Sequence, residues 1–338
     1  MLTVVILFLF FAIVLYFLLG GADFGAGIIE LFTSDSNKTR TRKTSYQAIG
    51  PIWEANHMWL VIAVVILFVG FPTIYSQMSI YLHIPILIML MGIIARGTAF
   101  SFRNYDAIKG QNTQKLYNHI FAYSSVVTPL FLGIIAGSAI SGQIDFAANT
   151  FLSAYVFSWF NWFSIAVGFF TVTLCGFLAS IYLIGEADNP TDITRFIKKA
   201  KALNIAAFVC GGLVFIAAEF QNIRLAHWIF GSAVGLTAVT AALVSLVLLW
   251  ITINRGKKMI ARVFAAFQVT MILLSVGYQH FPNFIVLKGG QNLSLLADHA
   301  PEKTIGDLGI ALLIGSLFIL PALFYLYYSF REKGKSEV

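Results

Sequence analysis

The chain has 338 residues, of which 59% are hydrophobic and only 11% are charged. Soluble globular proteins carry roughly 25% charged residues, so this composition excludes a water-soluble enzyme, a disordered chain and a disulfide scaffold. The net charge of +7 favours a membrane protein whose Lys and Arg residues lie in cytoplasmic loops, rather than a nucleic-acid binder.

Nine segments are long and apolar enough to cross a bilayer, because a spanning helix needs ~20 mostly apolar residues. In chain order they are 2–32, 51–71, 80–102, 118–140, 158–184, 203–219, 227–252, 261–281 and 308–330. The first segment has no basic start and runs far beyond the length of a signal peptide, so we expect it to remain as a membrane anchor. The sixth is the shortest.

Basic residues lie in alternate loops of this arrangement. Eighteen of the 22 Lys and Arg residues fall in one set of loops, whereas the other set holds only Arg224, Lys288 and Lys303, and Arg96 lies inside a segment. Because basic loops stay on the cytoplasmic side, this pattern predicts an N-terminus outside and a C-terminus in the cytoplasm.

Short connections between the segments predict antiparallel neighbours. We therefore expect an all-α integral membrane protein with a single polytopic membrane domain over 1–338. The first four segments would form one four-helix bundle, the next four a second, and 308–330 an extra helix. The sequence Gly-Gly-Ala-Asp at 20–23 has an echo in Gly-Glu-Ala-Asp at 185–188, which leaves an internal duplication open. The polar loop 282–307 is long enough for a small folded cap.

Acidic and basic residues lie within or at the edge of the first three segments, and such residues are costly in lipid and often functional. Asp23 lies near the inner end of the first segment, Glu54 one turn into the second, Arg96 in the inner half of the third and Arg103 at its exit. At ~1.5 Å per residue, Asp23, Glu54 and Arg96 reach a similar depth, so we predict that they meet just inside the cytoplasmic boundary. An Asp23–Arg96 ion pair that holds the helices together, a charged relay and an ion site all remain open.

The start of the second segment is unusually polar. Trp53, Glu54, Asn56, His57 and Trp59 place an acid, an amide and an imidazole between two indoles, and residues three or four apart share a helix face. This pattern predicts a proton-handling or hydrogen-bonding cluster. The alternative for Glu54 is a first-turn carboxylate that stabilises the helix dipole.

Small residues surround Asp23 on the first segment. Gly21, Gly25 and Gly27 lie within two helical turns, and the first two form a GxxxG pattern. Because such a pattern lets a second helix approach closely, we expect this part of the segment to be a packing surface.

No pattern indicates a cofactor, a metal ion or a disulfide bound by this chain. His57 is the only clearly intramembrane His, and HxxH, CxxC, Walker and Rossmann patterns are absent. We therefore expect no haem or metal on the side chains of this chain. Cys175 and Cys210 lie inside apolar runs, which predicts buried free thiols.

Three motifs carry a resemblance to a known family. They are GGADFGAG at 20–27, PIWEANHMW at 51–59 and RGTAFSFR at 96–103. In order and spacing they resemble subunit II of the cytochrome bd-type quinol oxidases, and the length and nine-segment layout extend the resemblance over the whole chain. The better-known branch has Trp-Asp-x-Asn-Gln in the second motif, where this chain has an acid of the same kind and an imidazole in place of the amide.

This resemblance implies a heterodimer in the bacterial cytoplasmic membrane. Subunit I would carry haem b, haem d and the quinol site, and this chain would be its haem-free partner. Quinol would be oxidised, oxygen would be reduced to water, and a proton gradient would be generated. Membrane lipid is an expected partner, a small single-span subunit is a further candidate, and nucleic acid is not expected.

The resemblance also implies roles for the polar residues. The carboxylate at Glu54 would belong to a cytoplasmic proton-uptake route, together with Asp23 and His57. The supporting polar residues would be Arg96, Arg103, Asn56, Trp53 and Trp59. Two alternatives remain open from the residues themselves: a secondary transporter or channel subunit, which buried charges and a repeat would suit, and a purely structural partner whose polar cluster holds the assembly together.

Overall fold

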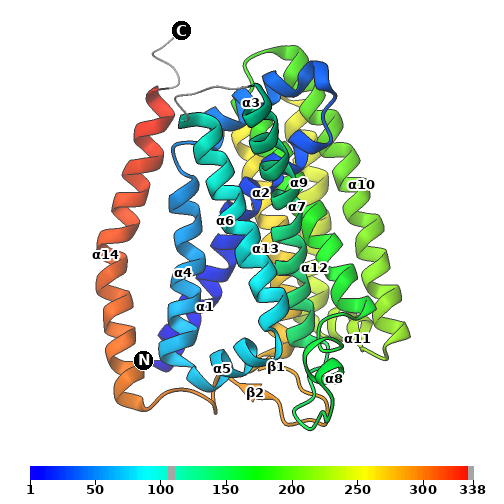
Figure 1. Ribbon diagram of the computed structural model, residues 1–338, viewed down its shortest axis with the longest axis vertical. Coiled ribbons are helices and arrows are strands. Elements are labelled where there is room, and N and C mark those ends of the chain that lie inside the picture. Colours follow the sequence, from blue (N-terminus) through cyan, green and yellow to red (C-terminus); the bar gives the residue numbers. More distant parts are fainter. Residues whose placement is uncertain (106–110, 334–338) are drawn as a thin grey trace.

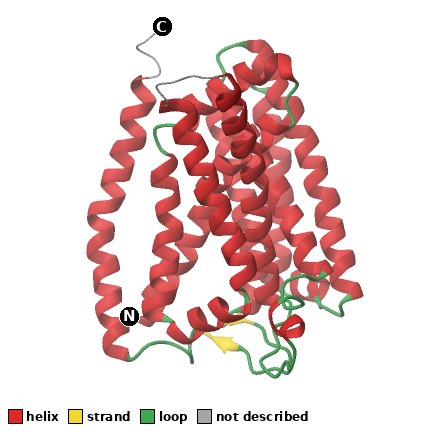
Figure 2. Ribbon diagram, viewed as in Figure 1, coloured by secondary structure: helices red, strands yellow, loops and turns green. Residues whose placement is uncertain are grey.

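The computed structural model describes residues 1–105 and 111–333, and most of them are helical (Figure 2). Within these described residues, nine helices are long and apolar enough to cross a membrane, which confirms the predicted all-α membrane fold. The spans are α1 with η1 and α2 (Leu2–Leu31), α4 (Trp53–Gly70), α6 (His83–Tyr105), α7 (Gln111–Ile140), α9 (Trp162–Glu186), α10 (Pro190–Phe220), α12 (Ala233–Asn254), α13 (Lys258–His280) and α14 (Glu302–Lys333).

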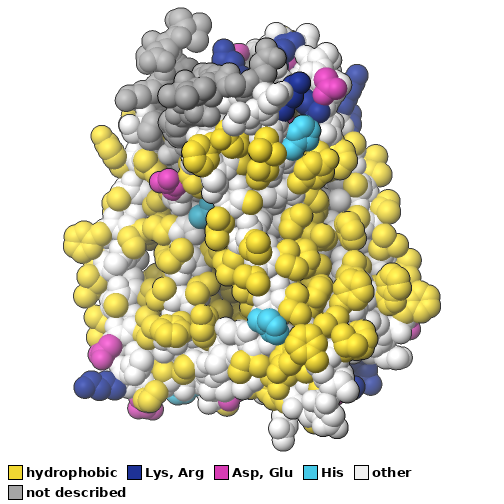
Figure 3. All heavy atoms as spheres, viewed as in Figure 1, with side chains coloured by type: hydrophobic (Ala, Val, Ile, Leu, Met, Phe, Trp, Pro, Cys, Tyr) yellow, Lys and Arg dark blue, Asp and Glu magenta, His cyan; other side chains and the backbone are white. Residues whose placement is uncertain are grey.

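Shorter elements close the two ends of the bundle (Figure 1). They are α3 (Asp35–Ile49), α5 (Pro72–Tyr81), α8 (Phe151–Tyr155), α11 (Leu225–Phe230), β1 (Asn283–Ile285) and β2 (Leu293–Ser294). Helix α3 lies at the end of the bundle where α6 and α14 finish, here called the α3 end, and the paired strands lie with the N-terminus at the opposite end, here called the hairpin end. Lys and Arg side chains gather mainly at the α3 end on the face drawn in Figure 3. Lys109 and Lys335, which belong to the basic loops, lie outside the described residues.

The first span changes neighbours halfway through the bundle. It consists of α1 (Leu2–Leu15), a π-helical turn η1 (Tyr16–Gly20) and α2 (Gly21–Leu31). Its first part packs against α4 and α14, whereas α2 packs against α7 and α9, so the span crosses the molecule diagonally (Figure 1). A π-turn widens one turn of an α-helix and often lies at a functional site, and here it separates the apolar part of the span from the part that carries Asp23.

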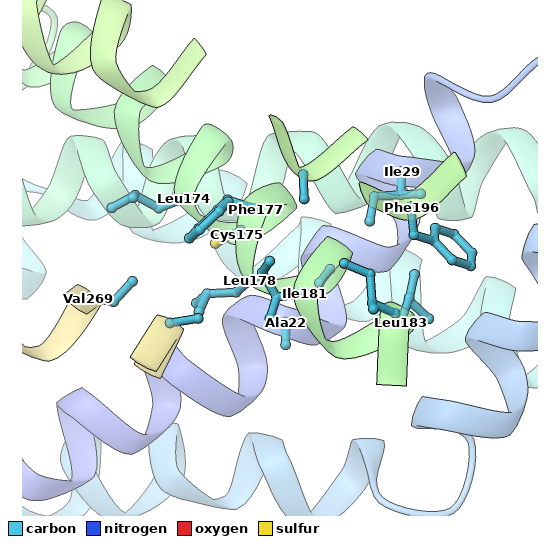
Figure 4. Packing of buried hydrophobic residues seen from close by; sticks show 14 of the residues in the cluster. Ala22, Ile29, Leu174, Cys175, Phe177, Leu178, Ile181, Leu183, Phe196 and Val269 are labelled. Carbon is cyan, nitrogen blue, oxygen red and sulfur yellow. The ribbon is translucent and has the colours of Figure 1, made fainter. Parts of the chain in front are cut away.

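Helix α9 is the centre of the main hydrophobic core. It packs against α2, α7, α10 and α13, and 67% of its most apolar stretch is buried, compared with 6% for α14. Figure 4 shows Leu178 and Phe177 of α9 beside Ala22 of α2, with Phe196 of α10 in the same cluster. Close packing of α2 on α9 therefore holds the first span in a fixed position.

Both cysteines are free thiols, as predicted. Cys175 is fully buried in the α9 core, but Cys210 on α10 is only partly buried. The expectation of two buried thiols is therefore wrong for Cys210, because α10 lies at the periphery of the bundle and exposes one face.

The sixth span is longer than predicted. It was expected at 203–219, but α10 runs from Pro190 to Phe220, so the basic stretch before it is helical and not a loop. The side chain of Asn189 accepts a hydrogen bond from the backbone N–H of Thr191 at 2.9 Å. An Asn cap followed by Pro at the first helical position is a strong start signal, and it extends the helix beyond its apolar part.

Other boundaries also differ from the apolar runs. The basic connection after the first span is not a short loop, because residues 35–49 form α3. The fourth span, α7, begins at Gln111 and the ninth, α14, at Glu302, before the predicted 118 and 308. The fifth span, α9, begins at Trp162, after the predicted 158. Polar residues can extend a helix into the aqueous layer, so hydropathy locates the membrane-crossing part and not the helix end.

The polar segment 282–307 contains regular structure at the hairpin end. Strands β1 and β2 pair antiparallel, with Ile285 opposite Leu293, and Leu287 forms a bridge with Ile144 near the end of α7. The division into two four-helix bundles stays a prediction. Since α2 and α7 pack on α9, the helices of the two expected bundles share one core.

Candidate functional site

Helix α2 carries two buried acids on one face. Asp23 and Glu30 are each 2% exposed and lie seven residues apart, which is close to two helical turns. On α6, Arg96 and Arg103 are 1% and 9% exposed and are also seven residues apart. The matched spacing brings Arg96 to Asp23 and Arg103 to Glu30, so the four side chains form two layers.

The layer deeper in the bundle, called the Asp23 layer, consists of Asp23, Asn56, Arg96 and Ser125. Asn56 Nδ2 donates to Asp23 Oδ2 at 2.9 Å. Arg96 Nη2 donates to the backbone oxygen of Asp23 at 2.7 Å, and its Nε donates to Ser125 Oγ at 3.2 Å. Among the described residues, the Asp23 carboxylate forms no ion pair. Of the alternatives left open by the sequence, a direct Asp23–Arg96 ion pair is therefore not present, and Arg96 contacts the Asp23 main chain instead.

The buried guanidinium of Arg96 is also held by aromatic rings. Its central carbon lies 5.2 Å from the ring centre of Phe24 and 5.0 Å from that of Phe121. Cation–π contacts of this kind strengthen where water is excluded. The positive charge therefore has a fixed position beside Asp23 without neutralising it through a direct bond.

The second layer, called the Glu30 layer, consists of Glu30, Arg42 and Arg103. Arg103 Nη1 donates to Glu30 Oε2 at 2.8 Å, and Arg42 Nε donates to Glu30 Oε1 at 2.5 Å. Each carboxylate oxygen thus has a guanidinium partner. The central carbon of Arg103 also lies 4.2 Å from the ring centre of Phe121, whose ring is in contact with the cations of both layers.

Sequence reasoning missed Glu30 and Arg42. Glu30 was read as the end of an apolar segment, and Arg42 as one of several basic loop residues. A signal was present, because the seven-residue spacing of Asp23 and Glu30 repeats in Arg96 and Arg103. Equal spacing of acids and guanidinium groups on the first and third spans, which run in the same direction, predicts two contacts rather than one.

The expected meeting of Glu54 with Asp23 and Arg96 is wrong. Glu54 is exposed on α4 and forms no ion pair or side-chain hydrogen bond among the described residues. Successive residues of a helix are ~100° apart, so Asn56 and Glu54 differ by ~200°. When Asn56 faces α2, Glu54 must face away from it, and depth alone could not reveal this rotation.

His57 and the two indoles lie next to the Asp23 layer. The His57 ring centre is 5.5 Å from Phe24, 5.9 Å from Tyr16 and 6.3 Å from Trp53. Buried His57 Nδ1, Tyr16 Oη and Trp59 Nε1 have no hydrogen-bond partner among the described residues. Because buried polar atoms normally have partners, this side of the layer has unused capacity for hydrogen bonds.

The three glycines bring α2 close to two neighbours. A Cβ at Gly25 would overlap the backbone carbonyl of Cys175 on α9, and a Cβ at Gly27 would overlap the side chain of Ser125 on α7. Gly21 lies against the Cys175 thiol. Gly27 therefore makes room for the hydroxyl that holds Arg96, and the glycine-rich stretch determines how α2 packs.

These features define a class of protein: a multi-pass helical membrane protein with a buried network of acids and guanidinium groups near one end of its first spans. The sequence profile of the family described as cytochrome bd terminal oxidase subunit II matches residues 1–330. The chain belongs to this family, as the resemblance of its three motifs indicated.

Relatives support the assignment over most of the chain. Cytochrome bd ubiquinol oxidase subunit 2 of Bacillus subtilis (strain 168) is 27% identical over 333 residues, which cover 94% of this chain and 92% of that protein. Cytochrome bd-I ubiquinol oxidase subunit 2 of Escherichia coli (strain K12) is 23% identical over 201 residues, covering 57% of this chain and 51% of that protein. A solved structure of bd oxidase from Geobacillus thermodenitrificans has the same fold, with a TM-score of 0.77 at 20% identity and coverage of 97% and 98%.

The chain is therefore a subunit of a terminal oxidase and a multi-pass protein of the bacterial cytoplasmic membrane. Membership places it in an oxidoreductase complex of the respiratory chain and implies a partner subunit I that carries haems.

The histidines of this chain differ in their neighbours. His83, His119 and His280 each place Nδ1 at hydrogen-bonding distance from a backbone carbonyl, whereas the His57 ring lies among Tyr16, Phe24 and Trp53. No group of three His, Cys, Asp or Glu residues in the described part could hold a metal ion.

Proposed function

We propose that this chain is the haem-free subunit of a quinol:oxygen oxidoreductase and that it helps bring protons from the cytoplasm to the partner subunit. The name of the Bacillus subtilis relative, a ubiquinol oxidase subunit, supports quinol as the reductant. Reducing one oxygen molecule to water consumes four electrons and four protons. Haem b and haem d on subunit I would transfer the electrons, while this chain would support subunit I and supply part of the proton path.

The proposed direction of uptake has the α3 end in the cytoplasm and the N-terminus outside. It is supported by the basic residues of α3 and of the start of α10, since positively charged segments stay cytoplasmic. With this orientation, the Glu30 layer is nearest the cytoplasm and the Asp23 layer is about two helical turns deeper.

The observation that carries the proposal is that Asp23 is buried while its carboxyl is bonded to a neutral side chain. Its carboxyl is 2% exposed, yet its side chain is held by the neutral amide of Asn56 and not by a cation. A carboxylate that is buried without a direct ion pair can alternate between charged and neutral forms. Glu30 has a guanidinium partner on each carboxylate oxygen and is not proposed as a carrier.

Neighbouring residues extend the route on both sides of Asp23. Glu54 is exposed in the first turn of α4 and faces away from α2, so water would carry the proton between Glu54 and the Asp23 carboxyl that Asn56 holds. On the other side of Asp23, buried polar atoms of His57 and Tyr16 have no hydrogen-bond partner among the described residues. We propose that a proton passes from Glu54 to Asp23 and leaves past His57 towards subunit I.

The test uses the purified complex of both subunits with the substitutions Asp23→Asn and Glu54→Gln. We expect normal haem content, with oxygen consumption and proton uptake in proteoliposomes about tenfold or more lower, because a general acid–base group contributes at least that much. Asp35→Asn is the matched control, because Asp35 is a fully exposed acid at the same end, paired with Lys38. Normal proton uptake by both variants would remove the proton role and leave a structural partner.

The two alternatives differ in what they require. A secondary transporter would use discontinuous helices near the middle of the membrane, whereas the first span stays helical through its π-turn. A purely structural partner requires that Asp23→Asn lowers stability and not turnover, so the same experiment distinguishes it.

A further inference from the structure

We infer that the α3 end binds the phosphate of an anionic phospholipid in a small basic cavity. The cavity has a volume of about 260 Å³, which is below the roughly 300 Å³ at which sites for drug-sized ligands begin, so it suits one polar headgroup. Its walls come from α3, the end of α6 and the start of α7. The lining side chains used below are Arg42, Lys43, Arg103, Asn104, Gln114 and Asn118.

The cavity has an excess of positive charge. Three of its lining side chains are cations and none is an acid. Glu30, which lies behind this wall, pairs with both Arg42 and Arg103, so it offsets one positive charge. Lys43 forms no ion pair among the described residues. The three cations therefore outnumber the single acid that contacts them.

The two arginines have donors left for a ligand. Glu30 uses Nε of Arg42 and Nη1 of Arg103, whereas a guanidinium carries five N–H donors. The planar fork of Arg matches the oxygens of a phosphate. The side-chain oxygen of Asn118 is buried and has no hydrogen-bond partner in the described part of the chain, and a headgroup hydroxyl would donate to it. The cavity thus combines charge with unused donors and an unused acceptor.

Its position favours a lipid over a soluble anion. Asn104 ends the apolar span of α6 and Asn112 begins that of α7, so the cavity lies at the level where lipid headgroups meet the protein. Nearby on the same two helices, Phe102, Leu116 and Tyr123 are 50%, 57% and 58% exposed. These side chains offer an apolar surface on which acyl chains can lie while the phosphate occupies the cavity.

The test is native mass spectrometry of the purified two-subunit complex with added phosphatidylglycerol, phosphatidylcholine or inorganic phosphate. We expect retention of phosphatidylglycerol, and about fivefold weaker binding for Lys43→Gln, because one basic residue near an anionic membrane contributes about 1 kcal/mol. Asn118→Asp should weaken binding about tenfold or more, since it places a carboxylate beside the phosphate. Lys38→Gln is the matched control, because Lys38 is also on α3 but pairs with Asp35 outside the cavity.

Three outcomes would overturn the inference. Equal retention of phosphatidylglycerol by Asn118→Asp, Lys43→Gln and the unmodified complex would show that the lipid binds elsewhere. Competition by inorganic phosphate at equal concentration would assign the cavity to a soluble anion, and absence of bound phosphatidylglycerol from the unmodified complex would mean that subunit I covers it. Haem content and size-exclusion profiles confirm that both variants are assembled. The inference needs only the membrane fold, so it survives if the proton role fails.

Discussion

The Asp23 and Glu30 layers are two turns apart on one helix and equally buried, yet they are built for different tasks. Glu30 has a guanidinium on each carboxylate oxygen. The Asp23 carboxylate instead accepts from the amide of Asn56, and Arg96 donates to the main-chain oxygen of Asp23 rather than to its carboxylate. Burial alone therefore does not separate a structural acid from a functional one. The identity of the nearest partner does, because a guanidinium stabilises a charged carboxylate more strongly than a neutral amide does.

The layers also differ in what they hold together. The Glu30 layer ties α2 to α3 and α6, so it fastens a peripheral helix to two spans. The Asp23 layer joins α2 to α4 through a neutral donor, Asn56, on the carboxylate. It joins α6 to α7 and α2 through bonds from Arg96 to a hydroxyl and to a main-chain oxygen. Substitutions in the first should mainly affect stability, and substitutions in the second should mainly affect turnover.

The largest effect is expected for Glu30→Gln. Removing this acid leaves the buried guanidinium of Arg103 and the partly exposed one of Arg42 without their anion, and breaking a buried pair such as Arg103–Glu30 costs about 3–5 kcal/mol. Thermal unfolding of the purified complex, together with haem content, measures the loss. Glu54→Gln, at an exposed acid, is the control and should leave the unfolding temperature unchanged. Equal unfolding temperatures for Glu30→Gln and the unmodified complex would erase the distinction between the layers.

A smaller loss is expected for Gly27→Ala. The new Cβ would overlap Ser125 and push its hydroxyl away from Arg96, and overpacking of this kind costs about 1–3 kcal/mol. The matched control is Gly212→Ala on α10, where a Cβ would meet nothing within 4 Å and helix propensity favours Ala. If both substitutions change the unfolding temperature equally, the close contact of α2 with α7 is not needed to hold Arg96.

Asp23→Asn should have a modest effect on stability and a large one on activity. The Asn side chain can still accept from Asn56, and Arg96 keeps its bonds to the main chain and to Ser125, so the loss of stability should be about 1 kcal/mol. Oxygen consumption should nevertheless fall about tenfold or more. An unfolding temperature as low as that of Glu30→Gln would instead place Asp23 among the structural acids.

The smallest effect is expected for Arg40→Gln. Arg40 donates to Asp192 at 2.8 Å and links α3 to α10, but its side chain is 46% exposed. Exposed ion pairs contribute about 0.2–1 kcal/mol and are screened by salt. Unfolding temperatures at low and high ionic strength should therefore differ between the unmodified and Arg40→Gln complexes only at low salt. A salt-independent loss comparable to that of Glu30→Gln would show that α3 is held mainly through α10.

Much of this architecture follows from short stretches of sequence. Each apolar run predicts a span because hydrocarbon excludes unpaired backbone polar groups, a requirement that every such helix meets within itself. The depth of Asp23 and Arg96 was also predictable, since position along a helix is a count of residues. The full lengths of α3 and α10 were not, because their polar ends have no hydropathy signal.

By itself, the sequence determined the number and course of the spans and the meeting of Asp23 with Arg96 at one depth. Only the tertiary structure decided which way each side chain turns: Asn56 faces Asp23 while Glu54 faces away, and Glu30 is enclosed by Arg42 and Arg103. The physical reason is that rotation about a helix axis depends on the π-turn at Tyr16–Gly20 and on how closely the glycine surface of α2 packs against its neighbours. The glycine pattern predicts that α2 packs closely, but no local pattern in the chain specifies the π-turn or the resulting rotation of the helices.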